Sequence, residues 1–382
     1  MLLKIMRRRS EIVLFAILLL ALFQVRAQEV SGDSILLNAD GSVTFQYRGP
    51  EARSVKVYCD CKLRRETITV RRENYHSAKM TRDSSGRWTY TTPPLASEVY
   101  TYLFSSDGTR FPDPSNPDSI RVRTEKMSVF TIGGNPWVDL CVNDSLHGRL
   151  DTVVFQSRNE AKARRMVVYT PPQYADSAQN FPVLYLLHGI NGDECSWNER
   201  GRAVQILDNL IDMQIAKPMI LVIPNANPQC LLSQDDELAG LAKNIFLYPA
   251  WGKREFEKCF SELDTFLSAK YRFSNTPGSR AVAGLSAGAK QSANLVNMYC
   301  GTFSSVGMFS PVVGHKQLPD NCSAKYWIGG GSGDLFHHRI NKFRRRLQRN
   351  HIPYTMYYSR GGHTWRNWRY YFGEYVRTLF WN

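Results

Sequence analysis

Two hydrophobic patterns divide the chain. Residues 28–135 contain short runs in which apolar and polar positions alternate, as at Val43, Phe45 and Tyr47, with turn residues between the runs. This period of two is typical of strands with one buried face. Residues 136–382 instead alternate short apolar runs with helix-compatible segments. We therefore expect an all-β, immunoglobulin-like sandwich followed by an α/β domain, whose mostly parallel sheet has helices on both faces.

Six apolar runs of the second part are expected to form strands. They are residues 165–169, 183–187, 219–223, 280–283, 326–328 and 354–358. In the first part, Trp88 lies on an alternating run, and we expect it in the core because large aromatic side chains are mostly buried.

A pentapeptide with the pattern Gly-x-Ser-x-Gly follows the expected strand at residues 280–283. Residues 284–288 read Gly-Leu-Ser-Ala-Gly and precede a helix-compatible segment. In this context the pattern is how α/β-hydrolases present a nucleophilic serine on a sharp turn. The two glycines have no Cβ to obstruct such a turn. Ser286 is therefore the expected nucleophile of a serine hydrolase.

Partners for this serine follow in the expected chain order. Asp334 and His363 come after the last two strands, which matches the order Ser, acid, His of α/β-hydrolases. His363 would accept the serine proton, and Asp334 would orient and stabilise the imidazole. Asp334 could instead cap a helix, and His363 could be a surface loop residue. The ordered set, with Trp365 and Trp368 beside the histidine, favours the catalytic interpretation.

The loops after two strands supply candidates for the rest of the site. The backbone N–H groups of Ile190, after His188-Gly189, and of Ala287 are expected to form an oxyanion hole. The substrate-pocket candidates are His188, Trp197, Phe246, Tyr248, Trp251 and Trp365. For the three on the stretch 225–253, a packing role is about equally favoured because aromatics also fill cores.

Four segments together resemble the bacterial esterases of carbohydrate esterase family one, which includes feruloyl and acetylxylan esterases. They are residues 182–197, 280–288, 327–334 and 361–368, and further matches lie at residues 165–172, 201–210 and 256–259. The resemblance implies an acyl-enzyme mechanism and an acylated plant polysaccharide or oligosaccharide of the xylan type as partner. Ile190 replaces a common glycine, and Ala287-Gly288-Ala289 replaces a common Met-Gly-Gly. Both changes keep the backbone N–H donors of the expected oxyanion hole. They can alter the pocket beside the acyl group, so the acyl group that the enzyme accepts is left open.

Residues 28–135 resemble the early-set module that precedes such esterase domains and is related to glycogen-type carbohydrate-binding modules. The segment Asp113-Pro-Ser-Asn-Pro117 is part of the match. Sugar binding does not follow from this resemblance, because packing against the catalytic domain would also explain the module.

The N-terminus predicts a secretory signal peptide over residues 1–27. Basic residues precede an apolar run at residues 12–23, and Val25-Arg26-Ala27 resembles a cleavage site. The run is shorter than the about 20 residues of a membrane span, so no stable membrane anchor is expected. Cleavage removes five Lys/Arg and one Glu, which lowers the formal charge from +14 to +10. We expect a periplasmic or extracellular protein that begins near Gln28.

The remaining positive charge has no module typical of nucleic-acid binding, so no nucleic-acid partner is expected. The densest basic run, residues 342–349, is interpreted as a solvated helix face. Attraction to an acidic polysaccharide or a membrane surface stays open.

Export also permits disulfides between the eight cysteines. They are Cys59, Cys61, Cys141, Cys195, Cys230, Cys259, Cys300 and Cys322. Their pairing is open, although Cys59 and Cys61 are expected to be badly placed to bridge each other because they are two residues apart on a strand. We expect each cysteine to be buried or bridged, and we expect no metal and no cofactor.

The sequence thus predicts a secreted serine esterase that removes feruloyl or acetyl groups from plant cell-wall polysaccharide. Three alternatives stay open: a siderophore-ester hydrolase of similar two-domain plan, an acyltransferase that uses a sugar hydroxyl as acceptor, and a catalytically silent carbohydrate-binding protein. The presence of Ser286, Asp334 and His363 counts against the last. The oligomeric state is left open.

Overall fold

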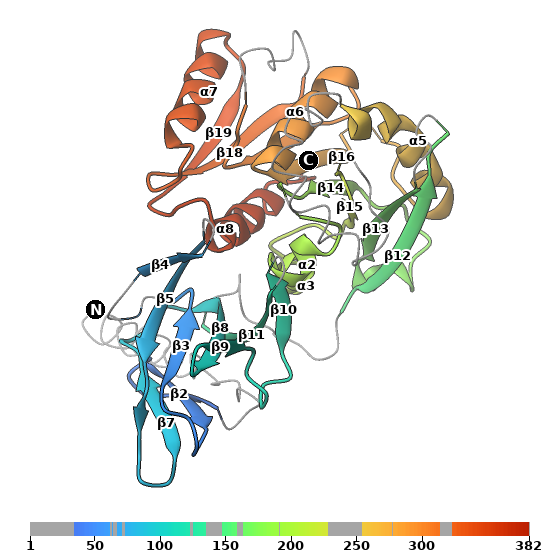
Figure 1. Ribbon diagram of the computed structural model, residues 1–382. Helices are drawn as coiled ribbons and strands as arrows, with labels where there is room; N and C mark the ends of the chain where they lie inside the picture. Colours follow the sequence, from blue (N-terminus) through green and yellow to red (C-terminus); the bar gives the residue numbers. More distant parts are fainter. Residues whose placement is uncertain are drawn as a thin grey trace, which may run out of the picture. The chain divides into compact units, whose positions relative to one another are not determined.

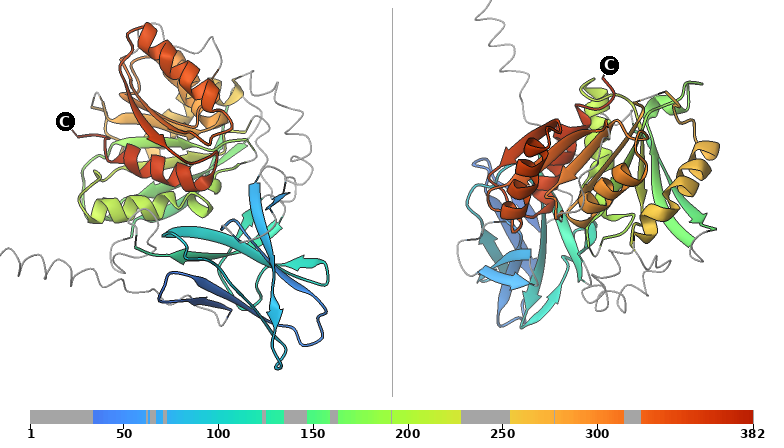
Figure 2. Two further views of the ribbon diagram at one scale, coloured as in Figure 1. Left: turned by 90° about the vertical axis from the view of Figure 1, so that its left-hand side faces the viewer. Right: turned by 90° about the horizontal axis from the view of Figure 1, so that it is seen from above.

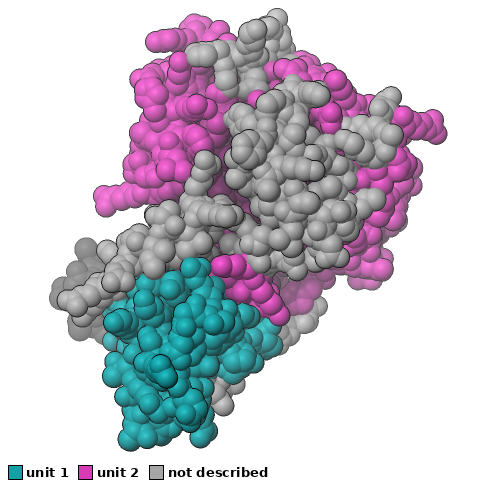
Figure 3. Space-filling view, viewed as in Figure 1, with its two compact units in different colours: residues 1–70, 74–118, 128–135 teal, residues 71–73, 119–127, 136–382 magenta. Residues whose placement is uncertain are grey.

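The chain forms two compact units in a computed structural model (Figure 1). The structure describes residues 34–61, 63, 67–70, 73–122, 125–134, 147–158, 163–190, 192–227, 254–276, 278–313 and 323–381. The first unit comprises residues 1–70, 74–118 and 128–135, and the second comprises residues 71–73, 119–127 and 136–382 (Figure 3). The expected signal peptide lies outside the described residues. Within them, no helix is long and apolar enough to cross a membrane.

Two sheets make up the β-rich N-terminal region, as far as it is described. One has the order β1 (Ile35–Leu37), β2 (Val43–Arg48), β7 (Arg87–Thr91) and β6 (Thr81–Arg82). The other has the order β10 (Ser119–Val122), β11 (Glu125–Ile132), β8 (Glu98–Ser106), β3 (Val55–Cys59), β5 (Glu73–Lys79) and β4 (Thr67–Val70), with β9 (Thr109–Phe111) paired to β8. Neighbours such as β2 and β7, or β3 and β8, run antiparallel.

The inner faces of these two sheets share one apolar core. Phe45 on β2 packs against Tyr102 and Phe130 of the other sheet, with ring centroids 5.2 and 5.7 Å apart. Trp88 is buried in the same core, and its Nε1–H donates to the carbonyl oxygen of Gly49 at 2.9 Å. The expected all-β sandwich is confirmed, and Trp88 has the core position expected for it.

Cys59 and Cys61 are joined by a disulfide, so the expectation that they cannot bridge each other was wrong. Strand β3 ends at Cys59, and the chain bends at the next residues. The same-face rule for a strand therefore does not apply to Cys61, and the two Cα atoms lie 5.1 Å apart. Cys300 is also disulfide-bonded, whereas Cys195 and Cys259 are thiols.

The second unit is built on a mostly parallel sheet. The described strands have the order β12 (Arg149–Gln156), β13 (Ala163–Thr170), β15 (Ile220–Pro224), β14 (Val183–Leu187), β16 (Arg280–Leu285), β17 (Ser305–Phe309), β18 (Lys325–Gly331) and β19 (Tyr354–Ser359). All pairs from β15 to β19 are parallel, while β13 runs antiparallel to both β12 and β15. The six expected strands are present, and β12 and β17 were not anticipated.

Helices cover both faces of this sheet (Figure 2). The core of one face includes residues of α5 (Glu255–Lys270), α6 (Ala287–Met298) and α7 (His337–Arg349), and that of the other includes residues of α2 (Ser196–Glu199), α3 (Ala203–Asp212) and α8 (Trp365–Val376). A 3-10 turn, η1 (Pro172–Tyr174), follows β13. Along β14, Val183 and Tyr185 enter the first core, and Leu184 and Leu186 enter the second. Because both faces are covered, the strands read as continuous apolar runs. The expected α/β fold is confirmed.

Candidate active site

The expected nucleophile lies on a tight turn between β16 and α6. Ser286 has φ 53° and ψ −110°, a left-handed conformation that is uncommon for a residue with a side chain. Its N–H donates to the carbonyl oxygen of Phe309 at 2.8 Å, which ties the turn to the end of β17. Ser286 is partly exposed between the buried residues Leu285 and Ala287. The turn therefore presents the hydroxyl outside the core, on a backbone that its neighbours hold in a strained conformation.

The glycines around Ser286 allow three backbone segments to meet. A Cβ on Gly284 would lie 2.5 Å from the carbonyl carbon of Gly288, and a Cβ on Gly288 would overlap the carbonyl oxygen of His188. A Cβ on Gly189 would lie 3.5 Å from Cβ of Ser286. The loop that follows β14 is therefore packed directly beside the nucleophile.

Asp334 and His363 lie on the loops after β18 and β19 and contact each other. Nδ1 of His363 is 3.1 Å from Oδ1 and 3.2 Å from Oδ2 of Asp334. The Asp334 side chain is fully buried, and that of His363 is 14% exposed. Parallel strands bring their carboxyl ends to one edge of a sheet, so this pair lies at the edge that carries Ser286.

Hydrogen bonds keep the Asp334 carboxylate ionised despite its burial. Burial raises the pKa of Asp334, but hydrogen bonds from His363, Ser310 and the Phe336 N–H together hold that pKa below its ordinary value. The Phe336 N–H donates to Oδ1 at 2.8 Å, so Asp334 also holds the turn that precedes α7. With Nδ1 engaged by the carboxylate, Nε2 is the His363 nitrogen that can accept a proton.

Ser310 is a site residue that the sequence reasoning missed. It directly follows β17, is fully buried, and has φ 50°. Its Oγ accepts a hydrogen bond from Nε1 of Trp368 at 3.1 Å and donates to Asp334. The Trp368 ring meets the His363 ring edge to face, with centroids 4.9 Å apart. Ser310 therefore links the acid to the tryptophan that packs on the base.

Phe336, also missed, packs on His363 with centroids 5.0 Å apart. Backbone hydrogen bonds join the acid loop to the base loop. The N–H of Gly333 donates to the carbonyl oxygen of Gly361 at 3.1 Å, and that of Ser332 donates to Ser359 at 2.9 Å. The acid and the base are therefore held as one assembly.

Ile190 and Ala287 stay the candidates for the oxyanion hole. Ala287 is the first residue of α6, where a backbone N–H has no acceptor within the helix. Ile190 follows Gly189, which packs against Ser286. Both N–H groups thus belong to backbone that flanks the nucleophile.

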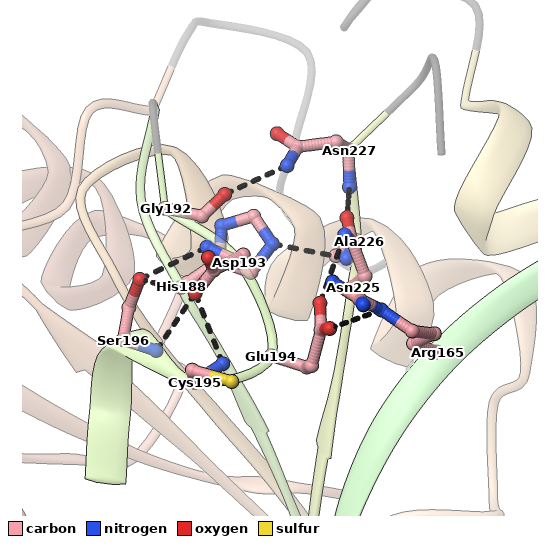
Figure 4. A network of polar contacts seen from close by, with 10 residues as sticks. All are labelled: Arg165, His188, Gly192, Asp193, Glu194, Cys195, Ser196, Asn225, Ala226 and Asn227. Atoms are coloured by element: carbon pink, nitrogen blue, oxygen red, sulfur yellow. Dashed lines mark hydrogen bonds and ion pairs between the residues drawn. The ribbon is translucent and has the colours of Figure 1, made fainter. Parts of the chain in front are cut away.

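His188 joins the loops that follow β14 and β15 (Figure 4). Its Nε2 accepts a hydrogen bond from the Ala226 N–H at 3.0 Å, because that N–H can only donate. Nδ1 therefore carries the proton and donates to the carbonyl oxygen of Gly189 at 2.7 Å. Burial lowers the pKa of His188, which favours this neutral ring. Nδ2 of Asn227 adds a second link by donating to the carbonyl oxygen of Gly192 at 2.7 Å.

An ion pair between the partly exposed Arg165 and the buried Glu194 supports the same two loops (Figure 4). Oε1 of Glu194 lies 2.6 Å from Nε of Arg165, and Oε2 accepts a hydrogen bond from Nδ2 of Asn225 at 2.9 Å. Burial raises the pKa of Glu194, while Arg165 and Asn225 act in the opposite direction. The loop beside Ser286 is thus anchored to β13 and to the end of β15.

The pocket candidates differ in where they lie. His188 and Trp197 are fully buried, and Nε1 of Trp197 donates to the carbonyl oxygen of Leu187 at 2.9 Å. These two residues have no exposed surface and support the site from within the core; their assignment to the pocket stays a prediction. Trp365 is partly exposed and packs edge to face on Trp197, with centroids 5.3 Å apart. The other candidates, Phe246, Tyr248 and Trp251, lie outside the described residues.

The described residues contain no cluster of three or more His, Cys, Asp or Glu side chains that could hold a metal ion. Cys195 lies near the site, but burial, with nearby carboxylates, raises its pKa to about 12. Its thiol is therefore protonated at neutral pH and is a poor nucleophile.

Comparisons with known proteins concern the family and the fold. Residues 160–327 match the model of a family described as "Putative esterase". An endo-1,4-beta-xylanase/feruloyl esterase of Xylanibacter ruminicola is 27% identical over 312 residues, which cover 78% of this chain. The chain spans only 39% of the length of that relative.

Solved structures share the fold. The CE1 ferulic acid esterase of the anaerobic fungus Anaeromyces mucronatus aligns with a TM-score of 0.53 and 21% identity, over 63% of this chain and 94% of that chain. The enterobactin esterase of Shigella flexneri aligns with a TM-score of 0.61 and 16% identity, over 91% of this chain and 96% of that chain. The chain therefore has the α/β-hydrolase fold, contains a segment that matches an esterase family model, and resembles carbohydrate esterase family one.

Proposed function

We propose that this protein is a secreted serine esterase that removes feruloyl or acetyl groups from plant cell-wall polysaccharide of the xylan type. The observation that carries the proposal is the buried Asp334–His363 pair at the sheet edge that bears the strained Ser286 turn. The name of the Xylanibacter ruminicola relative supports the acyl group and the polymer. The signal peptide expected at residues 1–27 supports export.

In the proposed reaction, Oγ of Ser286 attacks the ester carbonyl while Nε2 of His363 accepts the hydroxyl proton. Asp334 stabilises the imidazolium that forms, and the N–H groups of Ile190 and Ala287 bind the oxyanion. His363 then gives its proton to the departing sugar oxygen, which leaves an acyl-enzyme. Water attacks this ester with His363 as base, releases the carboxylic acid and restores Ser286.

The likeness to the enterobactin esterase extends over most of this chain and keeps siderophore-ester hydrolysis as a second candidate. At 16% identity it supports a shared fold and not a shared substrate. Acyl transfer to a sugar hydroxyl would use the same acyl-enzyme. A silent carbohydrate-binding protein would need neither the Ser286 turn nor the Asp334–His363 pair.

The test measures hydrolysis of methyl ferulate, p-nitrophenyl acetate and an ester of 2,3-dihydroxybenzoyl-serine by the chain from Gln28. Ser286→Ala serves as the blank. We expect Ser286-dependent hydrolysis of one or both of the first two esters, and their ratio identifies the acyl class. Turnover of only the third would replace the proposal by siderophore-ester hydrolysis. No turnover of any ester would reject hydrolysis and direct attention to acyl transfer or binding.

A further inference from the structure

Helix α7 carries a row of cations on its exposed side. Its apolar positions Ile340, Phe343 and Leu347 are buried in the core of the second unit. The exposed basic positions, called here the α7 surface, are His338, Arg339, Lys342, Arg345 and Arg349. Their spacing places them along one stripe of the helix, about 16 Å long at about 1.5 Å per residue.

The sequence around α7 supplies no acidic residue to balance this row. Between Asp334 and Glu374 there is no Asp or Glu, whereas the same stretch contains nine Lys and Arg residues. In the described part of the chain, no carboxylate lies within ion-pair distance of Arg339, Arg345 or Arg349. The positive charges of Arg339, Arg345 and Arg349 are therefore not neutralised by carboxylates of the described residues.

This arrangement differs from an ordinary solvated helix face, which interleaves both signs of charge. The first turn of α7 has no acidic residue, although acids there would interact favourably with the helix dipole. Arg345 and Arg349 are four residues apart, a spacing at which like charges repel. Arg349 lies in the last turn, where a cation interacts favourably with the helix dipole, but the rest of the row gains no such compensation. The one-signed charge of the α7 surface points to an anionic partner.

The row begins beside the candidate active site. The ring of Phe336 packs on His363 with centroids 5.0 Å apart, and Cζ of Arg339 lies over the same ring, 5.8 Å from its centroid. The first arginine of the row is therefore one aromatic ring away from the base. From there α7 runs beside β18 and β19, at the end of the described sheet (Figures 1 and 2).

Apolar surface is exposed at the same end of the helix. Leu335 is 71% exposed and Tyr358 is 54% exposed. The Tyr358 ring packs on His337, in the first turn of α7, with centroids 5.8 Å apart. An exposed tyrosine offers an apolar ring face and a polar hydroxyl, which suits a sugar ring.

We propose that the α7 surface, with Leu335 and Tyr358, binds an acidic stretch of the ester-bearing polysaccharide, in which sugar carboxylates meet the cations. This inference rests on the proposed function, because it defines the substrate as a uronate-bearing chain. A uronate-bearing chain combines anionic groups with ring faces, and the site combines cations with exposed apolar side chains. The row starts at the base, as expected of a surface that aligns a polymer whose ester is cleaved there.

The experiment compares glucuronoxylan that carries the acyl group hydrolysed by the wild type, feruloyl or acetyl, with a polymer whose carboxyl groups were reduced before the same acylation. The quantity measured is the ratio of kcat/KM on the acidic polymer to kcat/KM on the reduced polymer. The variant is Arg345→Gln/Arg349→Gln. The matched control is Lys258→Gln/Lys270→Gln on α5, which removes two exposed charges from another helix. Like the α7 variant, it changes one basic residue in the last turn of its helix.

We expect the wild type to prefer the acidic polymer and the α7 variant to lose about fivefold of this preference, the scale of two exposed charge contacts. The control variant should keep the wild-type ratio. Added salt should reduce the preference because it screens exposed charges.

Equal ratios for the wild type on the two polymers, or equal losses in both variants, would overturn the inference. So would binding to phosphatidylserine vesicles without any preference for the acidic polymer. The small esters distinguish failure of the proposed function from failure of this inference. If the wild type hydrolyses neither methyl ferulate nor p-nitrophenyl acetate, the proposed function fails, whereas hydrolysis of both polymers without acid preference rejects only the role of the α7 surface.

Discussion

Ser286 and Ser310 both have a positive φ at the ends of adjacent parallel strands, with values of 53° and 50°. Each keeps its N–H in the hydrogen-bond ladder of the sheet. The N–H of Ser286 donates to Phe309, and that of Ser310 donates to Gly329, both at 2.8 Å. Neighbouring strands thus end in two related turns, one that presents the candidate nucleophile and one that supports the acid.

Ser310→Ala should destabilise the protein and change its dependence on acid pH. The hydroxyl helps to hold the pKa of Asp334 below its ordinary value, so the folded-state pKa should rise in the variant. Because the pKa of Asp334 is lower in the folded than in the unfolded protein, its ionisation stabilises the fold at pH values above the unfolded pKa of about 3.9. That stabilisation is lost as the pH falls through the folded-state pKa. We expect the free energy of unfolding, measured with urea, to be about 1–3 kcal/mol lower than that of the wild type at pH 7. This difference should become smaller toward pH 3.

Ser310→Gly is the matched control for this prediction, because it removes the same hydroxyl without the cost of a left-handed backbone at a residue with a side chain. It should be more stable than Ser310→Ala by up to about 1 kcal/mol and show the same pH dependence. An unchanged pH dependence in both variants would exclude a role for the hydroxyl in the ionisation of Asp334.

Gly288→Ala should damage both the fold and the activity. Its new Cβ would overlap the carbonyl oxygen of His188 and lie 2.6 Å from that of Leu187, so α6 and the loop after β14 must separate. We expect kcat on p-nitrophenyl acetate to fall about 10- to 100-fold through misplaced oxyanion donors. Gly301→Ala is the comparison, because its φ of 86° is also strained but no atom lies near its Cβ. Gly301→Ala should lose stability without that loss of kcat, and equal losses of kcat would contradict the argument.

His188→Gln should make stability less sensitive to mildly acidic pH. Burial lowers the pKa of His188, so protonation favours the unfolded chain. The neutral His188 ring contributes its full stabilisation of the fold at pH values above the unfolded pKa of about 6.5. This contribution is lost as the pH falls toward the lower folded-state pKa. Gln can still accept the Ala226 N–H but does not titrate. We expect the wild type to lose more stability than the variant between pH 7 and pH 5, and parallel curves would show that His188 is not the titrating group.

Asp334→Asn should separate the two roles of this side chain. An amide oxygen can still accept the Phe336 N–H, but it cannot stabilise a protonated His363 as a carboxylate does. We expect kcat to fall about 10³- to 10⁴-fold, the scale known for this change in other triads. Asp334→Ala should lose as much activity and, in addition, the stability contributed by the hydrogen bond from the Phe336 N–H. Wild-type kcat in Asp334→Asn would remove Asp334 from the proposed triad.

Most of the fold could be predicted from local sequence patterns. Strands covered on both faces appear as apolar runs, and the pentapeptide around Ser286 encodes its turn within a few residues. β17 was not anticipated. This strand is short and contains Gly307. A Cβ on Gly307 would lie 2.8 Å from the ring of Tyr375, so the glycine is required by a packing contact that cannot be inferred from the sequence.

Long-range contacts explain the remaining differences between prediction and structure. Ser310 meets Asp334 and Trp368 only because β17, β18 and α8 converge, and no spacing in the sequence reports that convergence. The core positions of His188 and Trp197 likewise depend on partners far along the chain. The sequence alone does not distinguish a ring near a catalytic motif that faces the substrate from one that is buried in the core.

The order of the strands has one further consequence. The candidate nucleophile Ser286 follows β16, an interior strand with parallel neighbours on both sides, whereas the candidate base His363 follows β19, the last strand of the described sheet. Peripheral strands open locally at lower free energy than interior ones. Heat should therefore detach the base from an otherwise folded protein, so that inactivation begins at a lower temperature than melting of the central sheet.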